Sequence, residues 1–285
     1  MYQFPIGVIL ESYRLSRSEA IKKAAAMGAK GIQMYATEGE NSPENLSPAA
    51  RRELRKEVQE NGLIFSALCG DLGRGFGNRE LNPSLIEKSK RIVELAKDLG
   101  TDIVTTHIGV VPADVSHERY KIMQEACFEL SRFADSMEAH FAIETGPERS
   151  EVLKQFLDSL GSKGVGVNLD PANLVMVTGD DPVTAVHNLK DYIVHTHAKD
   201  GIRLRESNPE YIYNVVHPIP EEFCGIKYFE EVPLGTGSVD FAKYLKALEE
   251  IGYRGFLTIE REVGKNPEAD IKTAYDFLTK TIAEN

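Results

Sequence analysis

The sequence predicts an α/β protein whose 285 residues form a single (β/α)8 TIM barrel, residues 1–285. Short apolar, often β-branched runs alternate along the whole chain with longer amphipathic stretches, a pattern that favours a parallel sheet. There are eight such runs, the number of strands that closes a barrel. A doubly wound open sheet is the alternative, but its nucleotide-binding form needs a glycine-rich turn after the first strand. Glu11-Ser12-Tyr13-Arg14 stands there instead.

Each helix follows a strand and has recognisable ends. The expected strands are residues 6–10, 31–35, 64–68, 102–107, 141–144, 166–170, 192–197 and 256–260. Ser16 and Glu19 have the spacing of a capping box, and a proline follows both Ser47 and Asn82 where it can open a helix. The later helices are expected at about 117–137, 149–160, 181–190, 239–251 and 267–282.

Composition narrows the class of protein. A net charge of -11 disfavours nucleic acid as the main partner. No apolar run approaches the roughly 20 residues that span a bilayer, and the first residues lack a signal-peptide pattern. We therefore expect a soluble, cytoplasmic protein with no membrane partner. The three cysteines are far apart and without CxxC spacing, so we expect small apolar core residues and neither a disulfide framework nor a thiolate zinc site.

One segment interrupts the alternation. Residues 201–237, here called the lid segment, follow the seventh strand, contain several prolines and show no clean helical pattern. Long insertions of this kind in a compact domain are usually functional. We expect it to lie over the C-terminal mouth of the barrel as a lid or a subunit contact, although a plain surface insertion fits the sequence equally well.

The ends of the last four strands carry polar side chains that point to a metal ion. Glu144, Asp170, His197 and Glu260 would reach one rim of a barrel. Taken singly, each could be a helix cap, a surface charge or a core histidine. Together, three carboxylates and an imidazole would repel and raise one another's pKa values unless a cation offsets them. Such an oxygen-rich set suits Mn²⁺, Mg²⁺ or Co²⁺, and Zn²⁺ less well.

Five fragments carry a family resemblance. They are Ile143-Glu144-Thr145-Gly146, Asn168-Leu169-Asp170-Pro171-Ala172-Asn173, His195-x-His197-x-Lys199-Asp200, Pro233-Leu234-Gly235-x-Gly237-x-Val239-Asp240-Phe241 and Ile259-Glu260. In this order they resemble the xylose isomerase-like TIM barrels called sugar phosphate isomerases and epimerases, which include ketose 3-epimerases, hydroxypyruvate isomerase and inosose dehydratase.

The resemblance implies a function and a site. It implies one divalent metal ion, most often Mn²⁺, held by Glu144, Asp170, His197 and Glu260. It also implies that Glu144 and Glu260 are the catalytic pair, which moves a proton next to a carbonyl of a sugar or polyol through an enediolate. Family members are often dimers or tetramers, so a homo-oligomer is expected.

Further residues are expected to contact the substrate. They are His107, Asn173, His195 and Arg203. Arg203 matches a substrate-binding arginine of the epimerases, although it could equally be an exposed loop charge. Asn173 departs from the family, because many epimerases have a histidine there. His107 and His195 lie on the same rim, and a structural hydrogen-bonding role fits His195 equally well.

Other functions remain open. A lyase on the same scaffold, such as an inosose-type dehydratase or an enzyme that cleaves a C-glycoside of a 3-oxo sugar, would use the same chemistry with a leaving group. An abasic-site endonuclease is disfavoured by the acidic charge and the lack of extra histidines. A non-catalytic binding protein would keep buried charges at a cost. No glycine-rich phosphate cradle or Arg/Lys cluster stands out, so we expect an unphosphorylated substrate.

Overall fold

Eight parallel strands form a closed barrel in the computed structural model, which describes residues 2–284. Around the barrel the strands follow the order β1-β10-β7-β6-β5-β4-β3-β2. Their bounds are β1 (Ile6–Ile9), β2 (Gly31–Tyr35), β3 (Ile64–Cys69), β4 (Ile103–Thr106), β5 (His140–Glu144), β6 (Val165–Leu169), β7 (Ile193–Ala198) and β10 (Leu257–Ile259). The predicted (β/α)8 barrel is confirmed, and every expected strand overlaps an observed one.

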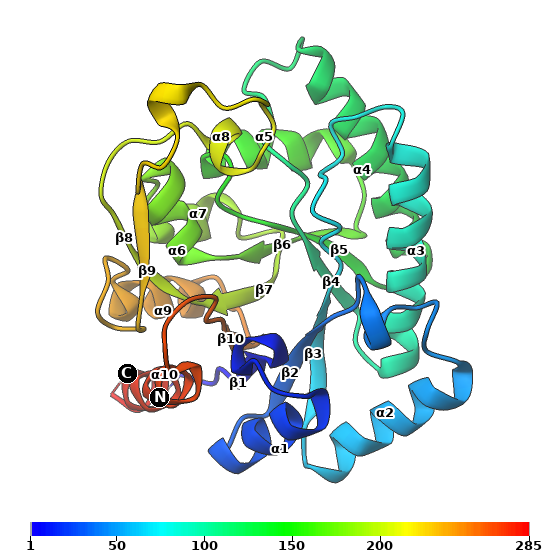
Figure 1. Ribbon diagram of the computed structural model, residues 1–285, viewed down its shortest axis with the longest axis vertical. Coiled ribbons are helices and arrows are strands. Elements are labelled where there is room, and N and C mark those ends of the chain that lie inside the picture. Colours follow the sequence, from blue (N-terminus) through cyan, green and yellow to red (C-terminus); the bar gives the residue numbers. More distant parts are fainter. Residues whose placement is uncertain (1, 285) are drawn as a thin grey trace.

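Helices cover the outside of the barrel (Figure 1). The long helices are α1 (Arg17–Met27), α2 (Pro48–Glu60), α3 (Asn82–Leu99), α4 (Glu118–Ser136), α5 (Ser150–Leu160), α7 (Pro182–Asn188), α9 (Phe241–Glu250) and α10 (Pro267–Ala283). The expected caps are present. The backbone N–H of Ser16 donates to Glu19 at 3.3 Å, and Ser47 Oγ accepts from the N–H of Ala50 at 3.2 Å.

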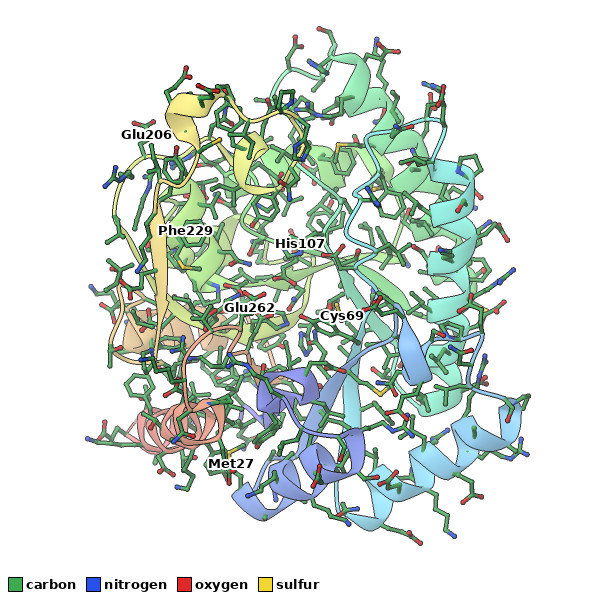
Figure 2. All side chains as sticks on the ribbon, in the orientation of Figure 1. Met27, Cys69, His107, Glu206, Phe229 and Glu262 are labelled. Atoms are coloured by element: carbon green, nitrogen blue, oxygen red, sulfur yellow. The ribbon has the colours of Figure 1, made fainter. Side chains whose placement is uncertain are left out.

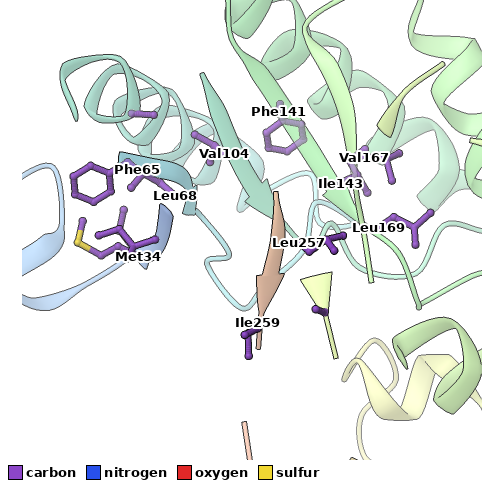
Figure 3. Packing of buried hydrophobic residues seen from close by; sticks show 14 of the residues in the cluster. Met34, Phe65, Leu68, Val104, Phe141, Ile143, Val167, Leu169, Leu257 and Ile259 are labelled. Atoms are coloured by element: carbon purple, nitrogen blue, oxygen red, sulfur yellow. The ribbon is translucent and has the colours of Figure 1, made fainter. Parts of the chain in front are cut away.

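Alternate residues of each strand face two different environments. One set packs apolar side chains against the helices, and Figure 3 shows Met34, Phe65 and Val104 in this layer. Burying each such side chain contributes roughly 1.5–3 kcal/mol. The other set is polar and points into the barrel, because Gln33 on β2 reaches His197 on β7, a strand that does not neighbour β2. The interior is therefore prepared for polar chemistry.

The lid segment follows β7, as expected, but it is not structureless. Strands β8 (Asp200–Arg203) and β9 (Phe229–Val232) pair as an antiparallel hairpin. Between them lie α8 (Pro209–Ile212) and a 3-10 turn over Glu221–Phe223. An ion pair between Arg119 of α4 and Glu210 of α8 ties the segment to the barrel. Figure 1 shows the lid segment in yellow at the upper left.

Two further expectations can be compared with the structure. Cys69 and Cys127 are buried, as expected for small apolar core residues. For Cys224 the expectation is wrong, because this residue of the lid segment is exposed. Among residues 2–284, no helix combines the length and the apolar character needed to cross a bilayer.

Candidate metal centre

Four buried side chains converge at the C-terminal ends of neighbouring strands. Glu144 ends β5, Asp170 follows β6, His197 lies in β7 and Glu260 follows β10. One possible ligand atom from each lies within 4.8 Å of the others. None of the four residues is more than 8% exposed. The structure thus brings together all four residues that the sequence suggested as ligands.

The carboxylate of Asp170 is held so that one oxygen stays available. Asp170 caps the short turn α6 (Pro171–Asn173), where Oδ1 accepts from the N–H of Asn173 at 2.8 Å. The backbone N–H of Asp170 donates to Thr145 Oγ1 at 2.8 Å, which fixes the cap in place. The second oxygen, Oδ2, has no hydrogen-bond partner among the described residues and lies 3.5 Å from His197 Nδ1. A buried carboxylate oxygen without a donor is what a cation ligand needs.

A contact with Gln33, on the side of the ring away from the carboxylates, orients the imidazole of His197. Its Nε2 lies 3.1 Å from Gln33 Oε1, and Gln33 Nε2 in turn donates to Thr105 Oγ1 at 3.2 Å. Because the amide oxygen can only accept, the contact with Gln33 requires a proton on Nε2. Asn168 Nδ2 also lies 3.1 Å from Nε2, but it has Glu144 Oε2 as an acceptor at 3.0 Å. Nδ1 then faces the carboxylates, 3.1 Å from Glu260 Oε2 and 3.6 Å from Glu144 Oε1. A second partner that sets the tautomer in this way is typical of metal-binding histidines.

The electrostatics of the cluster favour a cation. Burial raises the pKa of Asp170 to about 6, with added repulsion from Glu260 and Glu144. Burial would lower the pKa of His197, but the charges of Glu260 and Glu144 outweigh it and hold that pKa well above the ordinary value. Positive charge is therefore favoured at Nδ1, as an added proton or as a metal ion. Three carboxylates and one imidazole fit a single divalent metal ion.

Lys199 is a charged member of the cluster that the sequence reasoning did not single out. It is 3% exposed, its Nζ lies 3.2 Å from Glu260 Oε2, and it also forms an ion pair with Glu262. Burial would raise the pKa of Glu260, but the charges of Lys199 and His197 hold it well below the ordinary value. The sequence contained a signal for this position, because Lys199 comes two residues after His197 and so continues the same face just past the end of β7.

A cavity of about 610 Å³ opens over the cluster, within the size range of small-molecule sites. Two of the expected substrate contacts, His107 and Asn173, line it. Nε2 of His107 lies 3.7 Å from Glu144 Oε1, and its Nδ1 lies 3.3 Å from Asp71 Oδ2. Asn173 Nδ2 donates to Glu144 Oε1 at 3.1 Å. In Figure 2, His107 and Glu262 lie around the middle of the view and Phe229 lies on β9.

The lid segment supplies a wall of this cavity. The ring of Tyr213, which follows α8, lies 5.3 Å from the ring of His107, measured between centroids. Tyr213 and Asp71 both line the cavity, and sequence reasoning singled out neither of them. Their contacts with His107 join segments distant in the chain, so no local pattern could reveal them.

The other two expected substrate contacts do not line the cavity. His195 is buried within the barrel, where Nδ1 lies 2.9 Å from Asn168 Oδ1 and Nε2 lies 2.9 Å from Thr258 Oγ1. This is the structural arrangement that the sequence left open for His195. Arg203 on β8 packs against Gly179, where the missing Cβ leaves room for the guanidinium.

Comparison with known proteins places this geometry in a family. The model of the family described as "Xylose isomerase-like TIM barrel" matches residues 21–281. A protein of Haemophilus influenzae named putative L-ribulose-5-phosphate 3-epimerase SgbU is 25% identical over 88% of this chain and 85% of its own. An inosose dehydratase of Lacticaseibacillus casei is 26% identical over 43% of this chain and 39% of its own. The crystal structure of a xylose isomerase domain protein from Planctomyces limnophilus has a TM-score of 0.79 and 25% identity, covering 99% of both chains. The chain therefore belongs to the xylose isomerase-like TIM barrel family.

Proposed function

We propose that the protein is a divalent-metal-dependent isomerase or epimerase of sugars or related polyols. The observation that carries this proposal is the placement of two carboxylates, Glu144 and Glu260, in one buried cluster under a cavity of sugar size. They come from β5 and β10, which two other strands separate around the barrel. They therefore approach a bound substrate from different sides.

The two glutamates would transfer the proton on the carbon next to a carbonyl. Burial would raise the pKa of Glu144, but the charges of His107 and His197 outweigh it and lower that pKa. Glu144 is therefore ionised at neutral pH, as a proton acceptor must be. In an isomerisation, the acceptor returns the proton to the neighbouring carbon. In an epimerisation, the protonated carboxyl group on the opposite face delivers a proton, and exchange with water then removes the captured proton from the first glutamate and restores that of the second.

Other side chains would bind the substrate and hold the cofactor. A divalent ion held by Glu144, Asp170, His197 and Glu260 would supply positive charge to oxygens that become negative during the reaction. We propose Mn²⁺, because hard oxygen ligands predominate and one imidazole is present. Nε2 of His107 has no hydrogen-bond partner among the described residues, and it faces the cavity as a contact for a substrate oxygen.

Deuterium exchange tests the proposal. The Mn²⁺-loaded protein is incubated in D2O with a panel of ketoses and aldoses, and deuterium is located by NMR. We expect deuterium next to a carbonyl with at least one sugar, and loss of this signal in Glu144→Gln and Glu260→Gln. Metal analysis before and after treatment with EDTA shows whether the signal follows the metal. No exchange with any sugar in the panel rejects the proposal.

A lyase is the second candidate, and the His107–Asp71 pair favours it. Burial lowers the pKa of His107, but the charges of Glu144 and Asp71 outweigh it and raise the pKa to about 9. His107 therefore carries a proton that a departing hydroxyl or aglycone could take. A relative named inosose dehydratase agrees with this reading. Loss of water or of an aglycone from a 3-oxo sugar, without inversion at carbon, would favour the lyase.

A further inference from the structure

More carboxylates than cationic side chains line the cavity. Six carboxylates line it, those of Asp71, Glu144, Glu230, Glu231, Glu260 and Glu262. Among the described residues, the lining contains two lysines, Lys199 and Lys227, and no arginine. With a divalent ion at the cluster and a proton on His107, the six carboxylates still exceed the positive charges of the lining by about one, and Arg261 pairs with Glu231 from outside the lining.

Both lysines already have carboxylate partners. The buried Lys199 pairs with the buried Glu260 and with the exposed Glu262. Lys227 Nζ lies 3.0 Å from Glu230 Oε2. Glu230 and Glu262 are the more exposed partners, whereas Glu144 and Glu260 are buried, so acidic groups stand at the mouth as well as at the base of the cavity.

The glycine-rich loop that follows β9 already binds a carboxylate of the chain itself. TIM barrels often bind phosphate with backbone N–H groups of the loops after the seventh and eighth strands. Here the loop after β7 contains Gly235 and Gly237, and both of their N–H groups donate to Asp200 Oδ2, at 3.0 and 2.9 Å. Oδ1 of Asp200 accepts from the N–H groups of Gly201 at 2.8 Å and Val239 at 3.1 Å. Asp200 is 1% exposed and does not line the cavity, so these N–H groups are already bound and are not available to a phosphate.

We propose that the cavity selects uncharged sugars or polyols and excludes their phosphate esters, with Glu230 and Glu262 setting this selectivity. The inference rests on the proposed function, because it assumes that a sugar binds with its reacting carbons at the metal cluster. The far end of such a sugar extends towards the exposed Glu230 and Glu262. A phosphate group there would bring a charge of about -1.5 to -2 against these carboxylates. The proposal separates this chain from relatives named for sugar phosphates.

Matched pairs of ligands test the selectivity. The protein is loaded with Mn²⁺ and dialysed to remove unbound metal. Isothermal titration calorimetry then compares ribulose with ribulose 5-phosphate, and fructose with fructose 6-phosphate. We expect the free ketose to bind at least about ten-fold more tightly than its ester. Equal or tighter binding of the ester overturns the proposal. Absence of binding by all four ligands also counts against it, because a cavity built for uncharged sugars should retain one of them.

Variants test which residues exclude the ester. The double variant Glu230→Gln/Glu262→Gln should lower the Kd of the ester about three- to ten-fold relative to that of the free ketose. The gain should shrink as salt is added, because exposed charges are screened. Glu206→Gln/Glu221→Gln is the matched control, since both are exposed acids of the lid segment that do not line the cavity. An equal gain in this control would show that net charge alone is responsible, which would refute the assignment.

The two proposals can fail separately. If the free ketose binds and deuterium exchange is absent, the proposed reaction is wrong and the selectivity stands. If exchange occurs faster with the phosphate ester, the reaction stands and the selectivity is wrong.

Discussion

Lys199 Nζ lies 3.2 Å from Glu260 Oε2, and the Lys199 residue is only 3% exposed. A buried ammonium group this close keeps the carboxylate ionised, because the low-dielectric surroundings strengthen the attraction between the two charges. The pair therefore belongs to the candidate metal centre.

Replacing Lys199 should disable Glu260 without displacing it. Lys199→Met removes the charge that helps to hold the pKa of Glu260 well below its ordinary value, so that pKa should rise. The acid limb of the pH–rate profile should move to higher pH, by about one unit or more. Mn²⁺ affinity at neutral pH should not fall, because the variant also loses a positive charge that repels the metal ion. Rate profiles and metal titrations check this. Lys227→Met is the control, and an equal shift in both variants would argue against a specific role for Lys199.

The stability of the metal-free protein should depend on Asp170 between about pH 4 and pH 6. Burial raises the pKa of Asp170 from 3.8 to about 6, so the folded protein holds a proton that the unfolded chain releases. The stability contributed by this group is full below about pH 4 and is lost as the pH rises through about 6. Asp170→Asn cannot titrate. In EDTA, its stability relative to wild type should therefore increase from pH 4 to pH 7, as measured by urea denaturation.

The same variant separates stability from metal binding. Mn²⁺ at 100 times its Kd should stabilise the wild-type protein by about 2.7 kcal/mol. Asp170→Asn should lose most of this gain, because an amide oxygen is a weaker ligand than a carboxylate. Parallel pH curves for the two proteins in EDTA, or an undiminished gain with Mn²⁺, would contradict the assignment of Asp170.

Gln33 should control metal affinity although it is not a ligand. Its Oε1 accepts from His197 Nε2 at 3.1 Å and so keeps the lone pair of Nδ1 directed at the carboxylates. Gln33→Leu removes this acceptor, and we expect Mn²⁺ affinity to fall about 10- to 100-fold. Thr105→Val, which removes only the partner of Gln33 Nε2, should have a smaller effect. Electron paramagnetic resonance of Mn²⁺ measures both. Equal affinity in Gln33→Leu and wild type would mean that His197 is oriented by other contacts.

Asp200 should be a structural anchor of the lid segment. Its carboxylate accepts four backbone N–H groups, from Gly201, Gly235, Gly237 and Val239. Asp200→Ala leaves these four donors, two buried and two part-buried, without an acceptor, which should cost about 3 kcal/mol of unfolding free energy. Urea denaturation measures it, with Asp191→Ala, at an exposed acid before β7, as the control. A loss below about 1 kcal/mol would mean that water replaces the carboxylate.

The fold was predictable because its signals are local. Alternation of apolar strands with amphipathic helices repeats along the chain, and the polar residues that matter stand at the ends of strands such as β5 and β6. The hairpin β8–β9 was missed, because its strands are short, partly exposed and separated by a long irregular stretch. Residue identity alone does not show that Asp200 pairs with Val232.

The site was predictable only in part. The positions of Glu144, Asp170, His197 and Glu260 follow from which strand end each occupies, and the structure brings them together. Strand alternation also put His195 on the face of His197, but two residues further back along β7 it lies deeper, among Asn168 and Thr258. The packing of Arg203 against Gly179 goes with the register of the hairpin, which places Arg203 opposite Phe229.

The separation of Glu144 and Glu260 is a property of the closed ring of strands, because each acid sits at the end of its own strand and hydrogen bonds join every strand to the next. The lid segment, in contrast, is an appendage between β7 and α9. A different lid segment on the same barrel would therefore change which substrates bind, while the distance between the two glutamates stays the same.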